Sequence, residues 1–290
     1  MAQSGSLSTL GGVGGSVGSP IESTWAYAAV LIETPLGSSG TGFLIGRRVG
    51  DADQWRSFLV TNKHVLSEKP AKRAAMQELL LHVNVERGSG LTAEAVAYPL
   101  NDARGSRVRE HPDPAVDVLA IDAVPLFNGV QGLSNKFVPE DWFATADKRA
   151  QLEITAGEEI VTVGYPSGIR QGRSNFPLIR QGIIASRLGE ELHEEQRDSA
   201  GNCRKRVTRG FLIDGATIPG SSGSPVVLKP VTGRYQGNAI LLSSAPALLL
   251  GIVAETRFAP IPFGVSAIPS FAGLGLAFDI ETIVETIDLF

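Results

Sequence analysis

A run of serines set between glycines is the segment of this sequence best suited to nucleophilic chemistry. Residues 219–227 read PGSSGSPVV, so a tight turn leads directly into an apolar strand. Glycine permits such a turn and the close approach of a substrate. A nucleophilic serine needs its hydroxyl at a sharp bend, with backbone N–H groups aimed at the oxygen that becomes negative during acyl transfer. Ser221, Ser222 and Ser224 compete for this role, and a hairpin turn without chemistry is the simple alternative.

A histidine at the end of an apolar strand is the matching candidate for a general base. The segment SFLVTNKHVL, residues 57–66, ends in a polar turn that presents His64. The sequence has four histidines, so there are few alternatives. His82 lies within the apolar run LLLHVNV, where a histidine is more often structural, and His111 and His193 lie in charged stretches typical of loops. We therefore expect His64 to be the base.

An aspartate enclosed by apolar residues could orient that histidine. In AVDVLAI, residues 115–121, Asp117 is the only polar residue. Burying an uncompensated charge is costly, so a carboxylate in this setting needs a partner, and a histidine N–H would serve. Asp113 lies between prolines in HPDP and should be solvated, while Asp122 lies beyond the run and is the weaker competitor. The alternative for Asp117 is a structural residue at the start of a strand.

The order of these residues along the chain narrows the interpretation. His64, Asp117 and Ser222 follow one another in the order of the chymotrypsin-like proteases, which differs from the order in subtilisins and α/β-hydrolases. An α/β-hydrolase turn would read G-x-S-x-G, but here Gly220 and Ser222 are followed by Ser224. Each motif is modest alone, and their order makes the combination far more specific.

The motifs resemble those of bacterial trypsin-like peptidases, and most closely the protease domain of the HtrA/Deg family. Aligned on the proline that follows, GSSGSP is similar to the GDSGGP or GNSGGP string of chymotrypsin-like proteases, which selects Ser222 as the nucleophile. LVTNKHV resembles the family's segment around the base, EEIVTVGYPSG its GxxVxxIGxPxG strand, and LLGIVAE its VIGINT strand. The resemblance covers roughly residues 38–285 and is weakest over 68–108 and 187–209.

This resemblance implies a serine endopeptidase that needs no metal and no organic cofactor. Ser222 would be the nucleophile, His64 the general base and Asp117 the residue that orients it. The N–H groups of Gly220 and Ser222 would form the oxyanion hole. A peptide or protein would be the substrate, and the sequence does not reveal whether a regulatory protein partner exists. A catalytically silent peptide-binding module and an esterase on the same fold are the alternatives.

The resemblance also places seven residues around the primary specificity pocket. None of them is charged, so we expect cleavage after small or medium-sized aliphatic residues. A carboxylate that would select Lys or Arg has one nearby candidate, Asp214, but it lies eight residues before Ser222, further than the chymotrypsin-like pattern requires. We expect Asp214 to be a strand residue instead. The predicted pocket residues are Ala216, Thr217, Ile218, Ile252, Val253, Ala254 and Leu276.

Three departures from the family pattern concern regulation. We expect no PDZ domain, because the chain ends at Phe290. Ser221 stands where zymogen-activated relatives have an aspartate that pairs with a freed N-terminus, so we expect no activation by N-terminal cleavage. The insertion from Glu190 to Arg209 mixes dense opposite charges. We expect it to be a solvated surface loop, with a regulatory element as the alternative.

Positioning the candidate residues requires a scaffold of short strands. From Thr24 onward, short apolar or alternating runs are separated by Gly, Pro, Asn and Asp, which is the pattern of antiparallel strands. We predict an all-β fold of two antiparallel six-stranded β-barrels of chymotrypsin type with a C-terminal α-helix, and one continuous sandwich is the alternative. A short helix is also expected within Ser67 to Leu81. The predicted parts are a flexible Gly/Ser-rich arm (1–21), an N-terminal barrel carrying His64 and Asp117 (22–148), a C-terminal barrel carrying Ser222 (149–278) and a terminal helix capped by Asp279 (279–290).

Composition and charge argue against several other classes of protein. The 290 residues include 26 Lys and Arg against 30 Asp and Glu, a formal net charge of -4, so we expect no nucleic acid partner. No apolar run reaches the ~20 residues of a spanning helix, so we expect no membrane segment. The first twenty residues lack the pattern of a signal peptide. The single cysteine, Cys203, cannot form an intramolecular disulfide, which favours a cytoplasmic location, although export of a processed form stays open.

Overall fold

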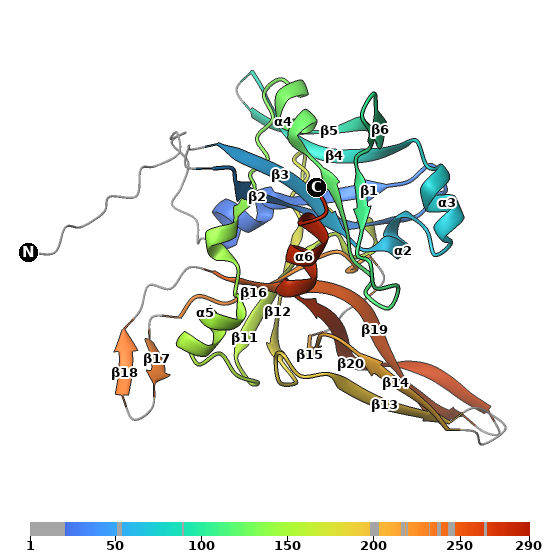
Figure 1. Cartoon of the computed structure of the whole chain (residues 1–290), viewed down its shortest axis with the longest axis vertical. Coiled ribbons are helices and arrows are strands. Elements are labelled where there is room, and N and C mark those ends of the chain that lie inside the picture. Colours follow the sequence, from blue (N-terminus) through green and yellow to red (C-terminus); the bar gives the residue numbers. More distant parts are fainter. Residues whose placement is uncertain are drawn as a thin grey trace, which may run out of the picture.

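A computed structural model places two β structures one above the other, with the last helix between them (Figure 1). The structure describes residues 21–290 except 51–53, 89, 198–202, 216–217, 219, 232, 237–238, 243–246 and 264–265. The predicted all-β fold with a C-terminal helix is confirmed. Of the described helices, none is long and apolar enough to cross a membrane.

Apolar runs of the first half form an eight-stranded sheet. Its strands are β1 (Ala29–Glu33), β2 (Ser39–Arg48), β3 (Trp55–Thr61), β4 (Glu78–Arg87), β5 (Gly90–Pro99), β8 (Val108–Glu110), β9 (Leu119–Asp122) and β10 (Val138–Pro139). The hydrogen-bonded order is β5–β4–β1–β2–β3–β9–β8, and β10 pairs with β2 in parallel. The prediction gave this half six strands in a barrel, whereas the described sheet has eight strands and its end strands, β5 and β8, are not paired with each other.

The second half forms a closed six-stranded barrel, as predicted. Its strands are β11 (Glu159–Gly164), β12 (Leu178–Ile184), β15 (Phe211–Asp214), β16 (Pro225–Leu228), β19 (Leu249–Phe263) and β20 (Ser266–Asp279). The order around the barrel is β11–β12–β15–β20–β19–β16, and every neighbouring pair is antiparallel. Closure leaves no unpaired barrel edge at these strands. Strands β19 and β20 continue beyond the barrel as a long hairpin (Figure 1).

Short hairpins and helices complete the chain. The hairpins pair β6 (Asn101–Asp102) with β7 (Gly105–Ser106), β13 (Leu192–Arg197) with β14 (Cys203–Thr208), and β17 (Gly233–Gln236) with β18 (Ala239–Leu242). The helices are the π-helix η1 (Ile21–Trp25), α1 (Ala26–Ala28), α2 (Lys63–Leu66), α3 (Pro70–Ala75), α4 (Val124–Gly129), the 3-10 helix η2 (Glu140–Trp142), α5 (Ala146–Gln151), the 3-10 helix η3 (Pro166–Gly168) and α6 (Ile280–Ile287).

A short helix lies within Ser67 to Leu81, as expected, but it occupies only part of that segment. Helix α3 ends at Ala75, and Glu78–Leu81 belong to β4. Leu79 and Leu81 alternate with less buried residues and pair with β5, while Leu81 also pairs with Ile32 of β1. Burial of alternate side chains between two neighbouring strands therefore overrides the local preference of this leucine-rich run for a helix.

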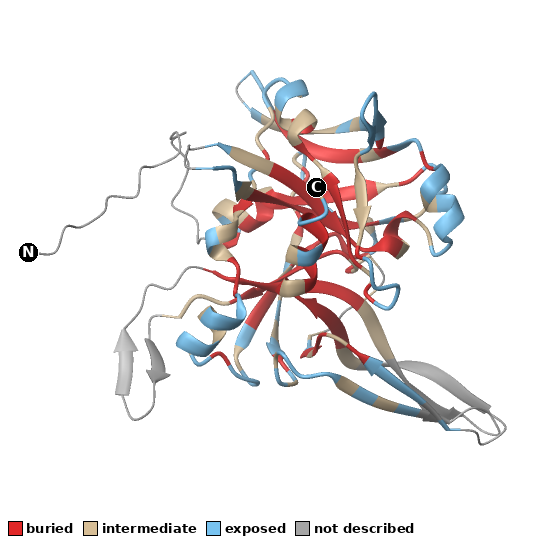
Figure 2. Ribbon diagram, viewed as in Figure 1, coloured by how far each residue is buried: buried red, intermediate tan, exposed pale blue. Residues whose placement is uncertain are grey.

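One core connects the two β structures. Figure 2 shows buried residues running from the upper sheet through α6 into the barrel. The shared cluster contains Phe43 and Phe58 of the sheet, Leu276 of the barrel, and Ile280 and Ile283 of α6. Residues from both halves are thus held against a common apolar core, which favours precise relative placement of the two halves.

The terminal helix is capped as the sequence predicted. Asp279 accepts a hydrogen bond from the backbone N–H of Thr282 at 3.2 Å, which satisfies one of the free donors of the first turn. Ile280, Ile283 and Ile287 lie on the buried face at helical spacing. Helix α6 is therefore fixed at its first turn and along one side, close to strands of both halves.

Candidate active site

The structure brings His64 and Asp117 together. His64 lies on α2, directly after the end of β3, and Asp117 lies in the loop between β8 and β9. The carboxylate of Asp117 is hydrogen-bonded to His64 Nδ1, and its second oxygen accepts the backbone N–H of His64 at 3.1 Å. Because an ionised carboxylate can only accept, His64 Nδ1 is the donor and Nε2 is left free to take a proton.

Asp117 also raises the proton affinity of the imidazole. Burial by itself would lower the pKa of His64, but the hydrogen bond with Asp117 and the negative charge of that residue outweigh it, with smaller contributions from Glu68 and Glu255. The pKa of His64 therefore lies above its ordinary value of 6.5. This is the electrostatic setting that a general base near neutral pH requires.

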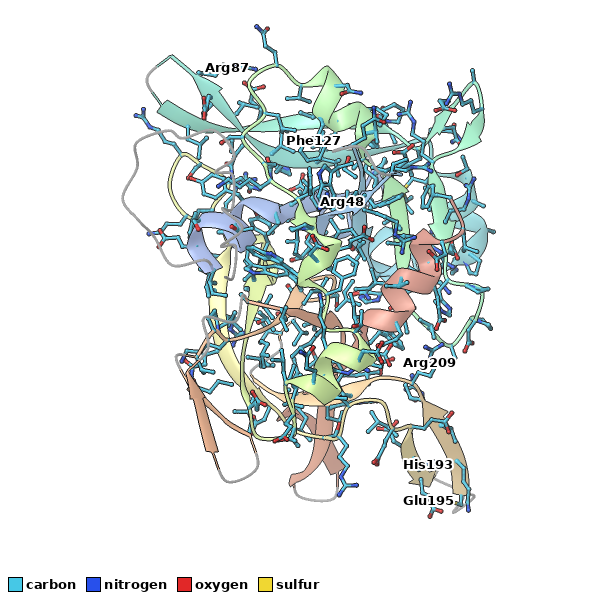
Figure 3. The ribbon with its side chains drawn as sticks, turned by 60° about the vertical axis from the view of Figure 1, so that its left-hand side comes forward. Arg48, Arg87, Phe127, His193, Glu195 and Arg209 are labelled. Atoms are coloured by element: carbon cyan, nitrogen blue, oxygen red, sulfur yellow. The ribbon has the colours of Figure 1, made fainter. Side chains whose placement is uncertain are left out.

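The competing aspartates and histidines have other partners. Asp113 is exposed and its carboxylate accepts the N–H of Ala115 at 2.8 Å, while Asp122 lies 3.6 Å from the guanidinium of Arg56. His82 contacts Glu33, and His111 contacts Glu285. His193 is exposed on the β13–β14 hairpin, as Figure 3 shows.

The turn that carries Ser222 is fastened to both halves of the molecule. The carbonyl oxygen of Ser222 accepts the N–H of Thr41 on β2 at 3.0 Å. The N–H of Gly223 donates to the carbonyl of Val253 on β19 at 2.9 Å. The Thr41 hydroxyl donates to the carbonyl of Gly220 at 3.1 Å and accepts the N–H of Tyr165 at 2.9 Å. Sequence reasoning missed Thr41, and a threonine within a strand offers no signal that it bridges two halves.

Glycine is required at position 223. Its φ is +84°, and a Cβ added there would lie 1.8 Å from the carbonyl oxygen of Thr41 and 2.7 Å from the hydroxyl of Thr61. Thr61 ends β3, the strand that leads to His64. The close approach at Gly223 therefore places the serine turn against the strand end that presents the histidine.

The candidate oxyanion donors lie in the same turn. The N–H groups of Ser221, Gly223 and Ser224 donate to carbonyl oxygens at 2.9 to 3.0 Å. Among the hydrogen bonds of the described residues, the N–H groups of Gly220 and Ser222 have no acceptor. Gly220 has a φ of +88° and packs against Ser167, so its peptide orientation is held from behind.

The hydrogen bond that the Ser222 hydroxyl makes in this structure is to the backbone of another strand and not to His64. This half-buried hydroxyl donates to the carbonyl of Ala254 on β19 at 3.2 Å. Catalytic hydrogen bonds are often absent from a protein without substrate and form only in the complex. Rotation about the Ser222 side-chain bond to another staggered position would redirect this hydroxyl.

Comparison with known proteins identifies the family of this chain. Residues 40–234, more than half of the chain, match the trypsin-like peptidase domain. The chain belongs to the trypsin-like peptidase domain family. Membership supports a serine peptidase in general.

Solved structures of the Rv3671c protease of M. tuberculosis are similar to this trypsin-like domain at low identity. The active form has 17% sequence identity and a TM-score of 0.46, with 91% of this chain and 81% of that chain covered. An inactive form has 16% identity and a TM-score of 0.44, with 93% and 91% covered. No curated protein matches the chain.

The predicted pocket residues of this trypsin-like domain are mostly packed side chains. Ala216 and Thr217 lie outside the described residues. Ile218 is half-buried, and Asp214, the rejected carboxylate, is exposed as the last residue of β15. The four remaining residues are each at most 2% exposed: Ile252, Val253, Ala254 and Leu276. Of these four residues, Ala254 is hydrogen-bonded to the Ser222 hydroxyl, through its backbone carbonyl.

The charged hairpin β13–β14 lies against β19, the strand that carries Ala254. Arg206 on β14 pairs with Glu255 at 3.0 Å, Glu255 pairs with Arg257 at 3.1 Å, and Arg257 pairs with Glu194 on β13 at 3.1 Å. Glu255 follows Ala254 directly on β19. The insertion that was expected to be a solvated loop is therefore largely a two-stranded hairpin tied to the strand that contacts Ser222. Positive and negative charges alternate along this contact. The sequence alone does not show which of these charges pair.

Proposed function

We propose that the chain is a serine endopeptidase that works through an acyl-enzyme, with Ser222 as nucleophile, His64 as general base and Asp117 as the orienting residue. The observation that carries the proposal is the Asp117–His64 pair beside a glycine-bounded serine turn, in which two N–H groups have no acceptor among the described residues. The order of the three residues and membership of the trypsin-like peptidase domain family support it.

In the proposed reaction, Ser222 rotates from Ala254 towards His64 when a peptide carbonyl enters. His64 Nε2 takes the hydroxyl proton as the Ser222 oxygen attacks the carbonyl carbon, while Nδ1–H stays bonded to Asp117. The N–H groups of Gly220 and Ser222 stabilise the oxyanion. His64 then protonates the leaving amine, and a water molecule, activated by the same base, releases the acyl group.

Labelling with a fluorophosphonate tests this proposal directly. A serine hydrolase should be modified at Ser222, and peptide mass spectrometry should locate the adduct on the 219–227 segment. A silent peptide-binding module on the same fold should not react. Modification of the denatured protein serves as the control, because an unfolded chain lacks the activated serine. An unmodified Ser222 in the folded wild-type protein would exclude the proposed mechanism.

An esterase on the same fold also labels, so substrates must separate it from an endopeptidase. We propose peptide bonds as the substrate because the serine turn is flanked by β19, whose Ala254 carbonyl faces the site and can accept an N–H of an extended peptide. An unfolded protein incubated with the chain should be cut at internal bonds. Hydrolysis of activated esters without any cleavage of peptide bonds would favour the esterase.

We also propose cleavage after small or medium-sized aliphatic residues, consistent with the HtrA/Deg resemblance. Four of the five described side chains of the predicted pocket, those of Ile252, Val253, Ala254 and Leu276, are apolar and packed into the core, so a large side chain would have to displace them. Sequencing the fragments of an unfolded protein checks this preference. A dominant preference for Lys, Arg or Glu before the cut bond would show the pocket assignment to be wrong.

The raised pKa of His64 predicts the pH dependence of this activity. The base must be neutral to accept the Ser222 proton, so kcat/KM should fall as the pH drops through the pKa of His64. Because that pKa is raised, the midpoint of the acid limb should lie above 6.5. Initial rates on a peptide substrate between pH 5 and pH 9 measure it, and a midpoint below 6.5 would contradict the electrostatic account.

A further inference from the structure

A buried lysine lies immediately before the candidate base. Lys63 is only 7% exposed and belongs to α2, next to His64. Its ammonium donates to the carbonyl oxygens of His111 at 2.9 Å and Asp113 at 3.1 Å. Both acceptors belong to the loop that carries Asp117, so the lysine side chain reaches from the base to the loop of its partner.

Burying an ammonium is costly and needs compensation. Burial lowers the pKa of Lys63, while the negative charges of Glu110 and Asp117 act in the opposite direction. The two direct acceptors are backbone carbonyls, whose positions follow the path of the loop. A lysine bound in this way constrains the backbone of residues 111–113 more than it serves as a surface charge.

Three consecutive residues hold the loop at successive points. Lys63 binds its beginning at His111 and Asp113, and Asn62 donates to the carbonyl of Asp117 at 2.6 Å. His64 binds the Asp117 carboxylate through both its ring and its backbone N–H. The loop is therefore attached to α2 and the residue before it near its beginning and at Asp117.

The other side of the loop is braced as well. The buried ring of His111 contacts Glu285 of α6 at 2.8 Å, and Arg209 makes two hydrogen bonds of 2.9 Å to the same carboxylate. Arg209 holds the pKa of Glu285 at about 2, with the contact to His111 acting in the same direction, so this carboxylate stays charged.

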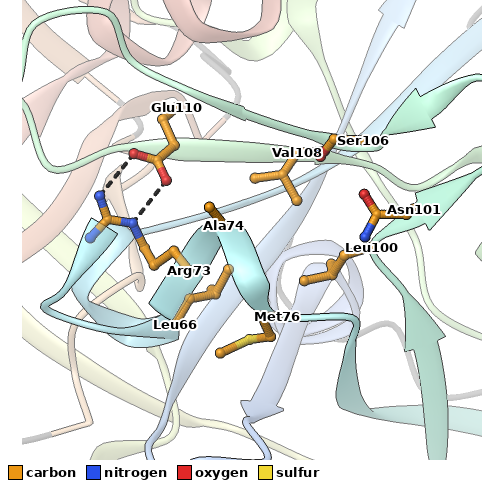
Figure 4. Close-up of a pocket in the computed structure, with 9 residues that line it drawn as sticks. All are labelled: Leu66, Arg73, Ala74, Met76, Leu100, Asn101, Ser106, Val108 and Glu110. Atoms are coloured by element: carbon orange, nitrogen blue, oxygen red, sulfur yellow. Dashed lines mark hydrogen bonds and ion pairs between the residues drawn. The ribbon is translucent and has the colours of Figure 1, made fainter. Parts of the chain in front are cut away.

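The residue before His111 is held too. Arg73 of α3 binds Glu110 through two hydrogen bonds of 2.8 and 2.9 Å, beside a cavity of about 200 Å³ that Figure 4 shows. The loop is thus held by Arg73 and by Glu285, and the ammonium of Lys63 connects it to α2, the helix that carries His64.

We propose that Lys63 is a positioning residue: its ammonium fixes the 111–117 loop so that Asp117 keeps both of its hydrogen bonds to His64. This inference rests on the proposed peptidase function, because the catalytic value of the position depends on His64 acting as the base. A misplacement of catalytic groups by about 1 Å can cost about 10²-fold in rate.

The variant Lys63→Met tests the proposal, since methionine retains much of the length and burial of lysine without its charge or donors. We expect kcat to fall by about 10- to 100-fold with KM within about two-fold of the wild-type value, because the loss concerns proton transfer and not substrate binding. The downfield proton resonance of His64 Nδ1–H should broaden or shift. Lys72→Met, on the exposed side of α3, is the matched control and should behave as the wild type.

The outcomes separate this proposal from the proposed function. Wild-type protein that neither labels nor cleaves would refute the peptidase function, whereas active wild type with an equally active, folded Lys63→Met variant would refute only the role of Lys63. A lowered melting temperature with unchanged kcat and an unchanged Nδ1–H resonance would show a merely structural lysine. If Lys63→Met does not fold, Lys63→Gln is measured against the same criteria.

Discussion

Replacing Ser222 with alanine is expected to lower kcat for peptide hydrolysis by ~10³- to 10⁶-fold, the range that triad replacements show in comparable enzymes. Without the hydroxyl, no acyl-enzyme can form, and only a slow attack by water remains. The glycines at 220 and 223 keep the turn, so the N–H groups of the oxyanion hole should persist and account for a residual rate. Active-site titration with a fluorophosphonate and initial rates on an unfolded protein measure the loss.

Neighbouring serines provide the matched control for this prediction. Ser224 is buried next to Gly164, and Ser224→Ala removes a hydroxyl from the same turn without touching the proposed nucleophile. It should retain labelling at Ser222. If Ser224→Ala lost labelling and Ser222→Ala kept full activity, the assignment of Ser222 as the nucleophile would be wrong.

A double variant separates a working triad from independent contributions. His64→Ala should be nearly as damaging as Ser222→Ala, and the pair together should cost little more than either alone, because residues that act as a unit are not additive. Fully additive losses would indicate that His64 and Ser222 do not act in one step.

The relation between sequence and structure differs between the candidate site and its surroundings. His64 and Asp117 could be predicted because an isolated polar residue within or after an apolar strand has few ways to be satisfied, and the structure pairs them. The placement of Ser222 against β2 and β19 could not be predicted. It depends on hydrogen bonds from Thr41, which lies in the other half of the chain, and from Gly223 to Val253, and no local pattern indicates either bond.

The predicted pocket shows a different limit. A resemblance aligns residues by their position in the chain, but it does not show where their side chains point. Alternation along β19 directs Ile252 and Ala254 into the core cluster that the two halves share, together with Leu276, and Val253 into a second buried cluster. The carbonyl of Ala254 is the group that the sequence could not indicate, since backbone groups carry no sequence signal.

The insertion from residue 190 to 209 shows how tertiary pairing changes the meaning of charge. Dense alternating charges are typical of a solvated segment. Here, Glu194 of β13 and Arg206 of β14 form ion pairs with residues of β19. No local sequence pattern connects the hairpin with that strand. The Arg206–Glu255 pair is exposed, and an exposed pair contributes little to stability, so this pairing determines where the hairpin lies more than how stable the protein is.

Replacing Asp117 with asparagine should reduce kcat by about 10⁴-fold at neutral pH while leaving the fold in place. The carboxylate accepts from both the ring and the backbone N–H of His64. An amide of the same shape has one acceptor and one donor, so with the acceptor on the backbone N–H its NH₂ group would face Nδ1. The ring would then carry its proton on Nε2 and could no longer accept the Ser222 proton.

The charge of Asp117 also raises the pKa of His64, so the variant should have a lower pKa at the histidine. Asp113→Asn is the matched control, because Asp113 is exposed and its side chain accepts the N–H of Ala115, which an asparagine oxygen can also do. Rates on an unfolded protein and the Nδ1–H proton resonance of both variants measure the effect. Equal activity in the two variants would remove Asp117 from the mechanism and leave the His64 pair as a structural contact.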